Sequence, residues 1–155
     1  MHIVIDANVL ISSLINHDGI PAIVTNEVIS SRRYTLILTE DITNEVRRVL
    51  DYPKIRKYIP FSGEHLKDWL TSIEMKALII DPRYKYAPIV LEDPKDDAYL
   101  IAAIEANADY IISGDKHLLN LHPYQGIPIV NPSTFLELNP IEGSEMEPLL
   151  MIKNN

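Results

Sequence analysis

The sequence predicts an α/β domain built on a parallel sheet of about five strands, with helices covering both faces. Three observations lead to this fold class. Short apolar segments rich in β-branched residues alternate with longer amphipathic segments, as in βαβ units. Right-handed crossovers between successive strands then place helices on both faces of the sheet. With 155 residues, of which 46% are hydrophobic, the chain can bury one sizeable core.

Five apolar segments predict the strands. The first ends at Asp6, and the fourth is followed by Gly114 and Asp115. The fifth contains Pro128, which suits an edge strand because proline cannot donate to the strand ladder. The predicted strands are residues 2–5, 34–39, 78–80, 110–113 and 127–130.

Six further segments predict helices. Residues 62–77 place Leu66, Leu70 and Ile73 at helical spacing, and Ser62 can cap this helix. One further helix is predicted to begin at Asp6 or Asn8, and another near Asp97. Three more are predicted over residues 22–29, 41–50 and 132–138. A polar, acidic tail over residues 139–155 follows the predicted domain of residues 1–138, and we expect it to be flexible or docked on a partner.

Two aspartates mark the expected ligand site. In a sheet of order 3-2-1-4-5, strands one and four are neighbours at the topological switch point. Asp6 and Asp115 follow those two strands, so we expect them side by side where open α/β sheets bind ligands.

Acidic side chains from separate elements are expected to gather at this edge. Asp6, Glu45, Asp115 and one of Asp96 and Asp97 fit that description. Clustered carboxylates repel one another unless a cation compensates them, and oxygen ligands suit Mg²⁺ or Mn²⁺. Such ions activate water and stabilise the leaving oxygen in phosphodiester hydrolysis.

Composition limits the other possibilities. Without cysteine, disulfides, thiolate metal sites and cysteine catalysis are excluded. No apolar run approaches the roughly 20 residues that span a bilayer, and the N-terminus lacks the pattern of a signal peptide, so we expect a cytoplasmic protein without a membrane partner. The net charge of −8 opposes field-driven binding to nucleic acid. Half of the Lys and Arg residues nevertheless lie within residues 32–57. Singly they are typical of a solvated helix face, and as a group they could contact a phosphate backbone or an acidic partner.

Four sequence motifs together resemble the PIN-domain ribonucleases, especially the toxins of toxin–antitoxin pairs. The motifs are Ile5-Asp6-Ala7-Asn8-Val9-Leu10, Thr39-Glu40-Asp41-Ile42-Thr43-Asn44-Glu45, Asp93-Pro94-Lys95-Asp96-Asp97 and Ala108 through Leu119, and residues 131–136 also look like that branch's terminal motif. The resemblance covers about residues 1–138. It implies a Rossmann-like three-layer α/β/α sandwich.

The resemblance also implies the site residues. Asp6, Glu45, Asp97 and Asp115 match the family's acids, and Asp6, Asp97 and Asp115 would hold Mg²⁺ or Mn²⁺. Asp96 could serve in place of Asp97. The matched supporting residues are Asn8 and Ser113, and Asp93 is expected to support the site from outside the ligand shell.

The activity implied is hydrolysis of RNA by a metal-dependent endonuclease, leaving 5′-phosphate and 3′-hydroxyl ends. A small antitoxin and a second copy of the chain are the implied protein partners. One alternative is a module of the same fold that binds RNA or protein but cleaves weakly, because Lys116, His117 and Leu118 stand where many relatives carry a further acid or asparagine. A receiver-like phosphoacceptor fits less well, because strand five is followed by Asn131-Pro132 and lacks a lysine.

Overall fold

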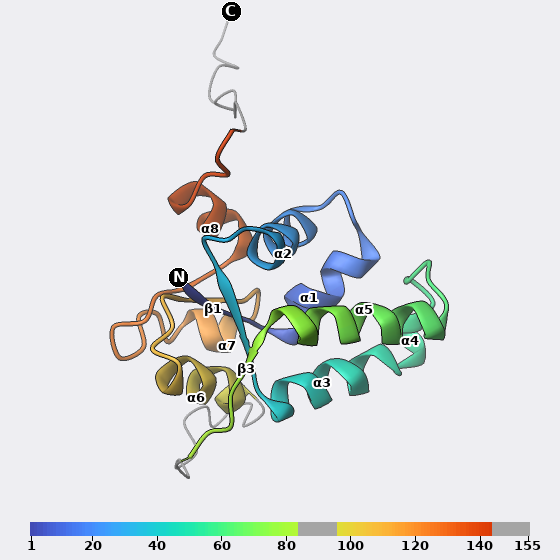
Figure 1. Cartoon of the computed structure of the whole chain (residues 1–155), viewed down its shortest axis with the longest axis horizontal. Helices are drawn as coiled ribbons and strands as arrows, with labels where there is room; N and C mark the ends of the chain where they lie inside the picture. The colour runs from blue at the N-terminus through green and yellow to red at the C-terminus, as the bar shows by residue number, and fades with distance from the viewer. Residues whose placement is uncertain (84–95, 144–155) are drawn as a thin grey trace, which may run out of the picture.

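The computed structural model describes residues 1–83 and 96–143, and the predicted supporting residue Asp93 lies outside them (Figure 1). Five strands form one parallel sheet of order β3-β2-β1-β4-β5. The strands are β1 (His2–Ile5), β2 (Thr35–Leu38), β3 (Leu78–Ile79), β4 (Tyr110–Ile112) and β5 (Ile129–Val130). The predicted fold class is confirmed, and the strand order is the one under which Asp6 and Asp115 are expected side by side.

The helices connect and cover the strands. They are α1 (Ala7–Ile15), α2 (Ile20–Ser30), α3 (Glu40–Leu50), α4 (Pro53–Arg56), α5 (Gly63–Lys76), α6 (Asp97–Glu105), α7 (Lys116–Leu119) and α8 (Pro132–Leu138). In Figure 1, α6 lies on one side of the sheet, and α2 and α8 lie on the other. The sequence did not predict the short helices α4 and α7.

Polar side chains fix where the helices begin. Asp6 accepts a hydrogen bond from the Val9 N–H, and Ser62 accepts one from the His65 N–H, at the starts of α1 and α5. Thr39 and Asn131 act in the same way at α3 and α8. Each side chain satisfies an N–H that the first helical turn leaves without a partner.

The core lies between the central strands and the helices on either side. Ile3, Val4, Ile5, Ile111 and Ile112 are fully buried, as expected of central parallel strands covered on both faces. The edge strand β3 differs, because both of its side chains are exposed. None of the helices in the described residues is long and apolar enough to span a bilayer.

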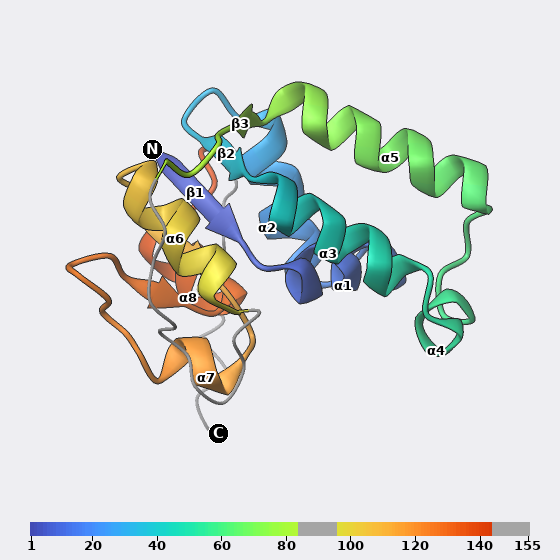
Figure 2. The ribbon, with the colours of Figure 1, turned by 90° about the horizontal axis from the view of Figure 1, so that it is seen from below.

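Two features of the molecule lie outside the sheet, namely an arm of three helices and the segment that follows α8. Helices α3, α4 and α5 extend away from the strands and form an arm on one side of the molecule (Figure 2). After α8, the Arg33 guanidinium donates a hydrogen bond of 3.1 Å to the Pro140 carbonyl and lies 3.8 Å from the Glu142 carboxylate. This first part of the predicted tail therefore lies against the end of α2.

Helix α8 is held to the sheet by one aromatic side chain. Phe135 is fully buried, and its ring packs edge-on against Tyr110 at 5.3 Å and against Tyr34 at 5.6 Å. We expect Phe135→Ala to lower the free energy of unfolding by about 3–5 kcal/mol, measured by urea denaturation. Leu138→Ala is the control, because Leu138 is on the same helix but exposed, and it should change stability by less than about 0.5 kcal/mol. Equal losses in the two variants would contradict this role for Phe135.

Candidate active site

A small acidic hollow lies beyond the carboxyl ends of β1 and β4. Its volume is about 50 Å³, and a single water needs roughly 10–15 Å³, so it has room for an ion with a few waters. Acids from four separate parts of the chain line it together with three other residues. The lining residues are Asp6, Ala7, Asn8, Glu45, Asp96, Tyr99 and Asp115.

The pairing of β1 with β4 places the first two acids. Ile5 is in register with Ile112, and the Asp6 N–H donates a hydrogen bond of 3.0 Å to the Ile112 carbonyl. Since both strands run in the same direction, Asp6 and Asp115 emerge at the same edge of the sheet. The expected placement of these two acids at the switch point therefore matches the structure.

Asp6 is the most buried of the acids, with 2% of its surface exposed. The Ser113 hydroxyl donates a hydrogen bond to its Oδ2, and the Val9 N–H donates one of 2.8 Å to its Oδ1. Burial raises the pKa of Asp6 above 3.8, these hydrogen bonds lower it, and the charge of Asp115 raises it further. The net shift is upward, so the fold disfavours the charged form of Asp6.

Ser113 connects the two strand-end acids. While its hydroxyl donates to Asp6, the same oxygen accepts a hydrogen bond of 3.0 Å from the Asp115 N–H. Asp115 in turn caps α7, because its Oδ1 accepts a 2.7 Å hydrogen bond from the His117 N–H. The structure thus gives Asp115 a structural role that the sequence analysis did not predict.

Glu45 reaches the hollow from the middle of α3. Its carboxylate forms an ion pair with the Arg48 guanidinium one turn further along the helix. The side chain of Glu45 is 25% exposed, so the pair lies at the rim of the hollow rather than inside it. Arg48 was not among the predicted site residues.

The two neighbouring aspartates at the start of α6 face different spaces. Asp96 is buried and lines the acidic hollow with Asp6 and Asp115. Asp97 lines an adjoining hollow of about 290 Å³ together with Glu45 and Arg48. Of the two, Asp96 therefore lies with the other three acids, whereas the resemblance favours Asp97.

Tyr99 is a site residue that the sequence analysis missed. It is buried one turn after Asp96, and its hydroxyl accepts a 3.1 Å hydrogen bond from the Ala7 N–H. Burial raises the pKa of Tyr99, and the negative charges of Asp6, Glu45 and Asp96 raise it further. The hydroxyl therefore stays protonated and can donate into the hollow. Its position in DAYLIAA, between two aspartates and an Ala-rich helix, gave no signal beyond that of a core tyrosine.

Comparison with known proteins identifies the family. The family model for the PIN domain matches residues 2–117, a range that includes every residue lining the acidic hollow. The chain belongs to the PIN-domain family. This PIN domain is 34% identical over 119 residues to the uncharacterized protein MJ1680 of Methanocaldococcus jannaschii, covering 77% of this chain and 74% of that protein. The PIN domain of human SMG5 matches with a TM-score of 0.47 and 13% identity, over 89% of this chain and 98% of the other.

PIN domains are generally nucleases and typically use divalent metals, so the residues that line the hollow are candidates for holding such an ion. Asp6, Glu45, Asp96 and Asp115 offer carboxylate oxygens, and the exposed Asn8 offers an amide oxygen. Hard divalent cations prefer oxygen, and Mg²⁺ keeps several waters beside one or two carboxylates. Within residues 1–83 and 96–143, no three His, Asp or Glu side chains converge as a ready-made metal site. The oxygen donors that line the hollow are nevertheless of the kind that such an ion prefers.

The buried charge of Asp6 gives a test of stability. Asp6→Asn keeps an oxygen for the Val9 N–H and removes the charge. Because the pKa of Asp6 is raised in the folded PIN domain, stability falls as pH rises from the unfolded-state pKa through the folded-state pKa. We expect Asp6→Asn to increase the free energy of unfolding by on the order of 1 kcal/mol at pH 7 in EDTA, and the gain to vanish below about pH 4.

Urea denaturation across this pH range measures the effect. Asp18→Asn is the control, because the side chain of Asp18 is 87% exposed. That control should be neutral at every pH. A gain for Asp6→Asn that persists at low pH, or a loss at pH 7, would show that buried charge is not the cause.

Proposed function

We propose that this PIN domain is a metal-dependent endoribonuclease that hydrolyses RNA phosphodiester bonds. The observation that carries the proposal is the convergence of Asp6, Glu45, Asp96 and Asp115, from four separate elements, on one hollow at the switch point of the sheet. Family membership supports it, since PIN domains are generally nucleases. Burial raises the pKa of Asp6 and so disfavours its charged form, and acids perturbed in this way are common at functional sites, which also supports the proposal.

Asp6, Asp96 and Asp115 would hold Mg²⁺ or Mn²⁺, directly or through water. When bound, such an ion lowers the pKa of a water and offsets negative charge that develops on the phosphate. Asp97, the residue that the resemblance puts in this role, would act from the adjoining hollow. No serine, cysteine or histidine nucleophile is needed.

The protein groups around the ion have distinct tasks. Ser113 holds the Asp6 carboxylate and the Asp115 backbone in place, since its hydroxyl donates a hydrogen bond to Asp6 and accepts one from the Asp115 N–H. The neutral Tyr99 hydroxyl offers a hydrogen-bond donor beside the acids. Glu45 would orient the attacking water or complete the ion's shell, and Arg48 would be released toward phosphate when Glu45 turns to that task.

The biological role proposed is that of a cytoplasmic toxin silenced by a small antitoxin, with cleavage leaving 5′-phosphate and 3′-hydroxyl ends. The sequence resemblance supports this role. Apolar side chains on α1 and α2 support a protein partner or a homodimer there, since Ile15, Ile20 and Ile23 are 38%, 42% and 38% exposed.

Cleavage of a labelled single-stranded RNA tests the activity. We expect cleavage with Mg²⁺ or Mn²⁺, none in EDTA, and more than about 100-fold loss in Asp6→Asn and in Asp115→Asn. Asp18→Asn should keep full activity. Cleavage that survives EDTA or both site substitutions would contradict the metal mechanism. Binding of RNA and Mn²⁺ without cleavage would favour the alternative, a PIN-fold binding module.

Measurements of metal binding can distinguish the roles of the adjacent residues Asp96 and Asp97. We expect Asp96→Asn to weaken Mn²⁺ binding by at least about tenfold in calorimetry, because Asp96 lies with Asp6 and Asp115. Asp97→Asn is the matched control, one residue away on the same helix, and should change the affinity much less. The reverse order would show that Asp97 is the ligand.

A further inference from the structure

We propose that the arm of the molecule carries a second binding surface, which holds single-stranded RNA by its phosphates and bases. This surface consists of the pocket between α3 and α5 and the adjoining residues 52–61, and we call it the arm surface. The inference rests on the proposed nuclease function only for the identity of the ligand. The surface is separate from the acidic hollow and binds without metal.

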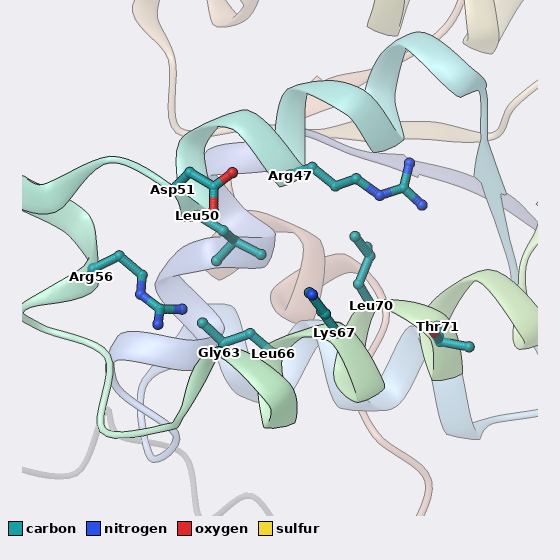
Figure 3. Close-up of a pocket in the computed structure, with 9 residues that line it drawn as sticks. All are labelled: Arg47, Leu50, Asp51, Arg56, Gly63, Leu66, Lys67, Leu70 and Thr71. Atoms are coloured by element: carbon teal, nitrogen blue, oxygen red, sulfur yellow. The ribbon is translucent and has the colours of Figure 1, made fainter.

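The pocket of the arm surface has a volume of about 510 Å³. Figure 3 shows α3 on one side and α5 on the other, with Arg56 reaching in from the α4 side. Leu50, Leu66 and Leu70 give the pocket an apolar floor, and Arg47 and Lys67 stand at its sides with Arg56. An apolar floor with cations around it suits a ligand that has both flat apolar parts and negative charge.

One stretch of the arm carries a net charge opposite in sign to that of the whole chain. Residues 47–67 contain six Lys and Arg and two Asp and Glu, a net charge of +4. Because the chain as a whole carries −8, the remainder carries −12. A local surplus of this kind attracts phosphate at short range even in an acidic protein.

The cations that line the pocket differ in whether an acidic side chain neutralises them. Arg47 forms an ion pair of 2.7 Å with Glu74. Arg56 lies against Gly63, where an added Cβ would stand 3.2 Å from its Nη2, so the glycine makes room for the guanidinium. In the part of the chain that the structure describes, neither Arg56 nor Lys67 forms an ion pair. These two cations are therefore the ones offered to a phosphate.

Exposed aromatic rings belong to the same segment of the chain as Arg56. Tyr52, Tyr58 and Phe61 are 45%, 60% and 44% exposed, and all three belong to the segment that joins α3 to α5. The Lys57 ammonium lies 5.0 Å from the centre of the Tyr58 ring. Aromatic rings interleaved with cations are typical of surfaces that stack unpaired bases and track the backbone between them. An acidic peptide would pair with the cations but would not need the rings.

The arm surface is within reach of the proposed active site. Glu45 lines the acidic hollow, and Asp51, six residues along the same helix, lines the pocket, so the two are roughly 9 Å apart along the helix axis. They lie on different sides of α3, so RNA would cross the C-terminal end of that helix. Arg48, whose side chain is 43% exposed, stands between them. Two or three stacked nucleotides span roughly this distance.

Fluorescence anisotropy of an end-labelled 12-nucleotide single-stranded RNA, with the full chain in EDTA, tests the proposal. We expect the Kd to rise at least about tenfold in the double variant Arg56→Glu/Lys67→Glu and about fivefold in Tyr58→Ala. Arg32→Glu is the matched control, because it reverses an exposed cation outside the arm, and it should change the Kd less than twofold. Circular dichroism checks that each variant is folded, and the milder Arg56→Gln/Lys67→Gln should show the same direction of change.

Unchanged RNA affinity in the folded double variant and in Tyr58→Ala would overturn the proposal. So would binding of an acidic peptide, such as residues 141–155 of this chain, that is lost in the double variant while RNA affinity is unchanged. The proposed nuclease function fails separately. RNA binding that depends on the arm, without any cleavage, would contradict the proposed nuclease function and support the arm surface. Cleavage with a KM that the arm variants leave unchanged would support the nuclease function and contradict the arm surface.

Discussion

The contact between Ser113 and Asp6 is the interaction on which the rest of the site depends. It joins the ends of two strands that are far apart in sequence but adjacent in the sheet, and it sits at the point where the connections diverge to opposite faces. The Ser113 oxygen also accepts a hydrogen bond from the Asp115 N–H, so the same hydroxyl connects the Asp6 side chain to the backbone of Asp115. Asp6 and Asp115 in turn begin α1 and α7, so the placement of both helices follows from this junction.

The junction brings negative charge together in a place that does not favour it. Burial disfavours the charged form of Asp6, and Asp115, Glu45 and Asp96 lie around the same hollow. A structural role alone would be met by asparagine or serine, which also cap helices. Carboxylates kept at such a place are better explained by a cation that compensates their repulsion. The cost in stability and the proposed capacity to bind metal then have the same cause.

Much of the fold and part of the site could be predicted from the sequence. Alternating strand-like and helical segments were enough for the parallel sheet. Given the order 3-2-1-4-5, two strand-end aspartates were enough to place Asp6 beside Asp115, because parallel strands put their carboxyl ends at one edge. The assignment between Asp96 and Asp97 could not be predicted, because successive helical residues point about 100° apart and the phase of α6 depends on the chain before it. Tyr99 and Arg48 were missed for a related reason, since only tertiary packing shows that their helix faces turn toward the acids.

The two sides of helix α3 explain how a protein with a net negative charge could bind RNA, as proposed. One side of the helix presents Glu45 to the hollow, and another presents Arg47 and Leu50 to the pocket facing α5. At physiological salt, charges more than about 8 Å apart in solvent are largely screened from each other, so distant acids do not cancel the positive charge of Arg56 and Lys67. Acids close by do neutralise their neighbours, since Glu74 forms an ion pair with Arg47 and Glu45 forms one with Arg48. Separation by one helix would therefore allow the proposed cation-binding acids and the proposed phosphate-binding cations to coexist. Where the two groups meet, at the boundary between the hollow and the pocket, Glu45 and Arg48 form an ion pair.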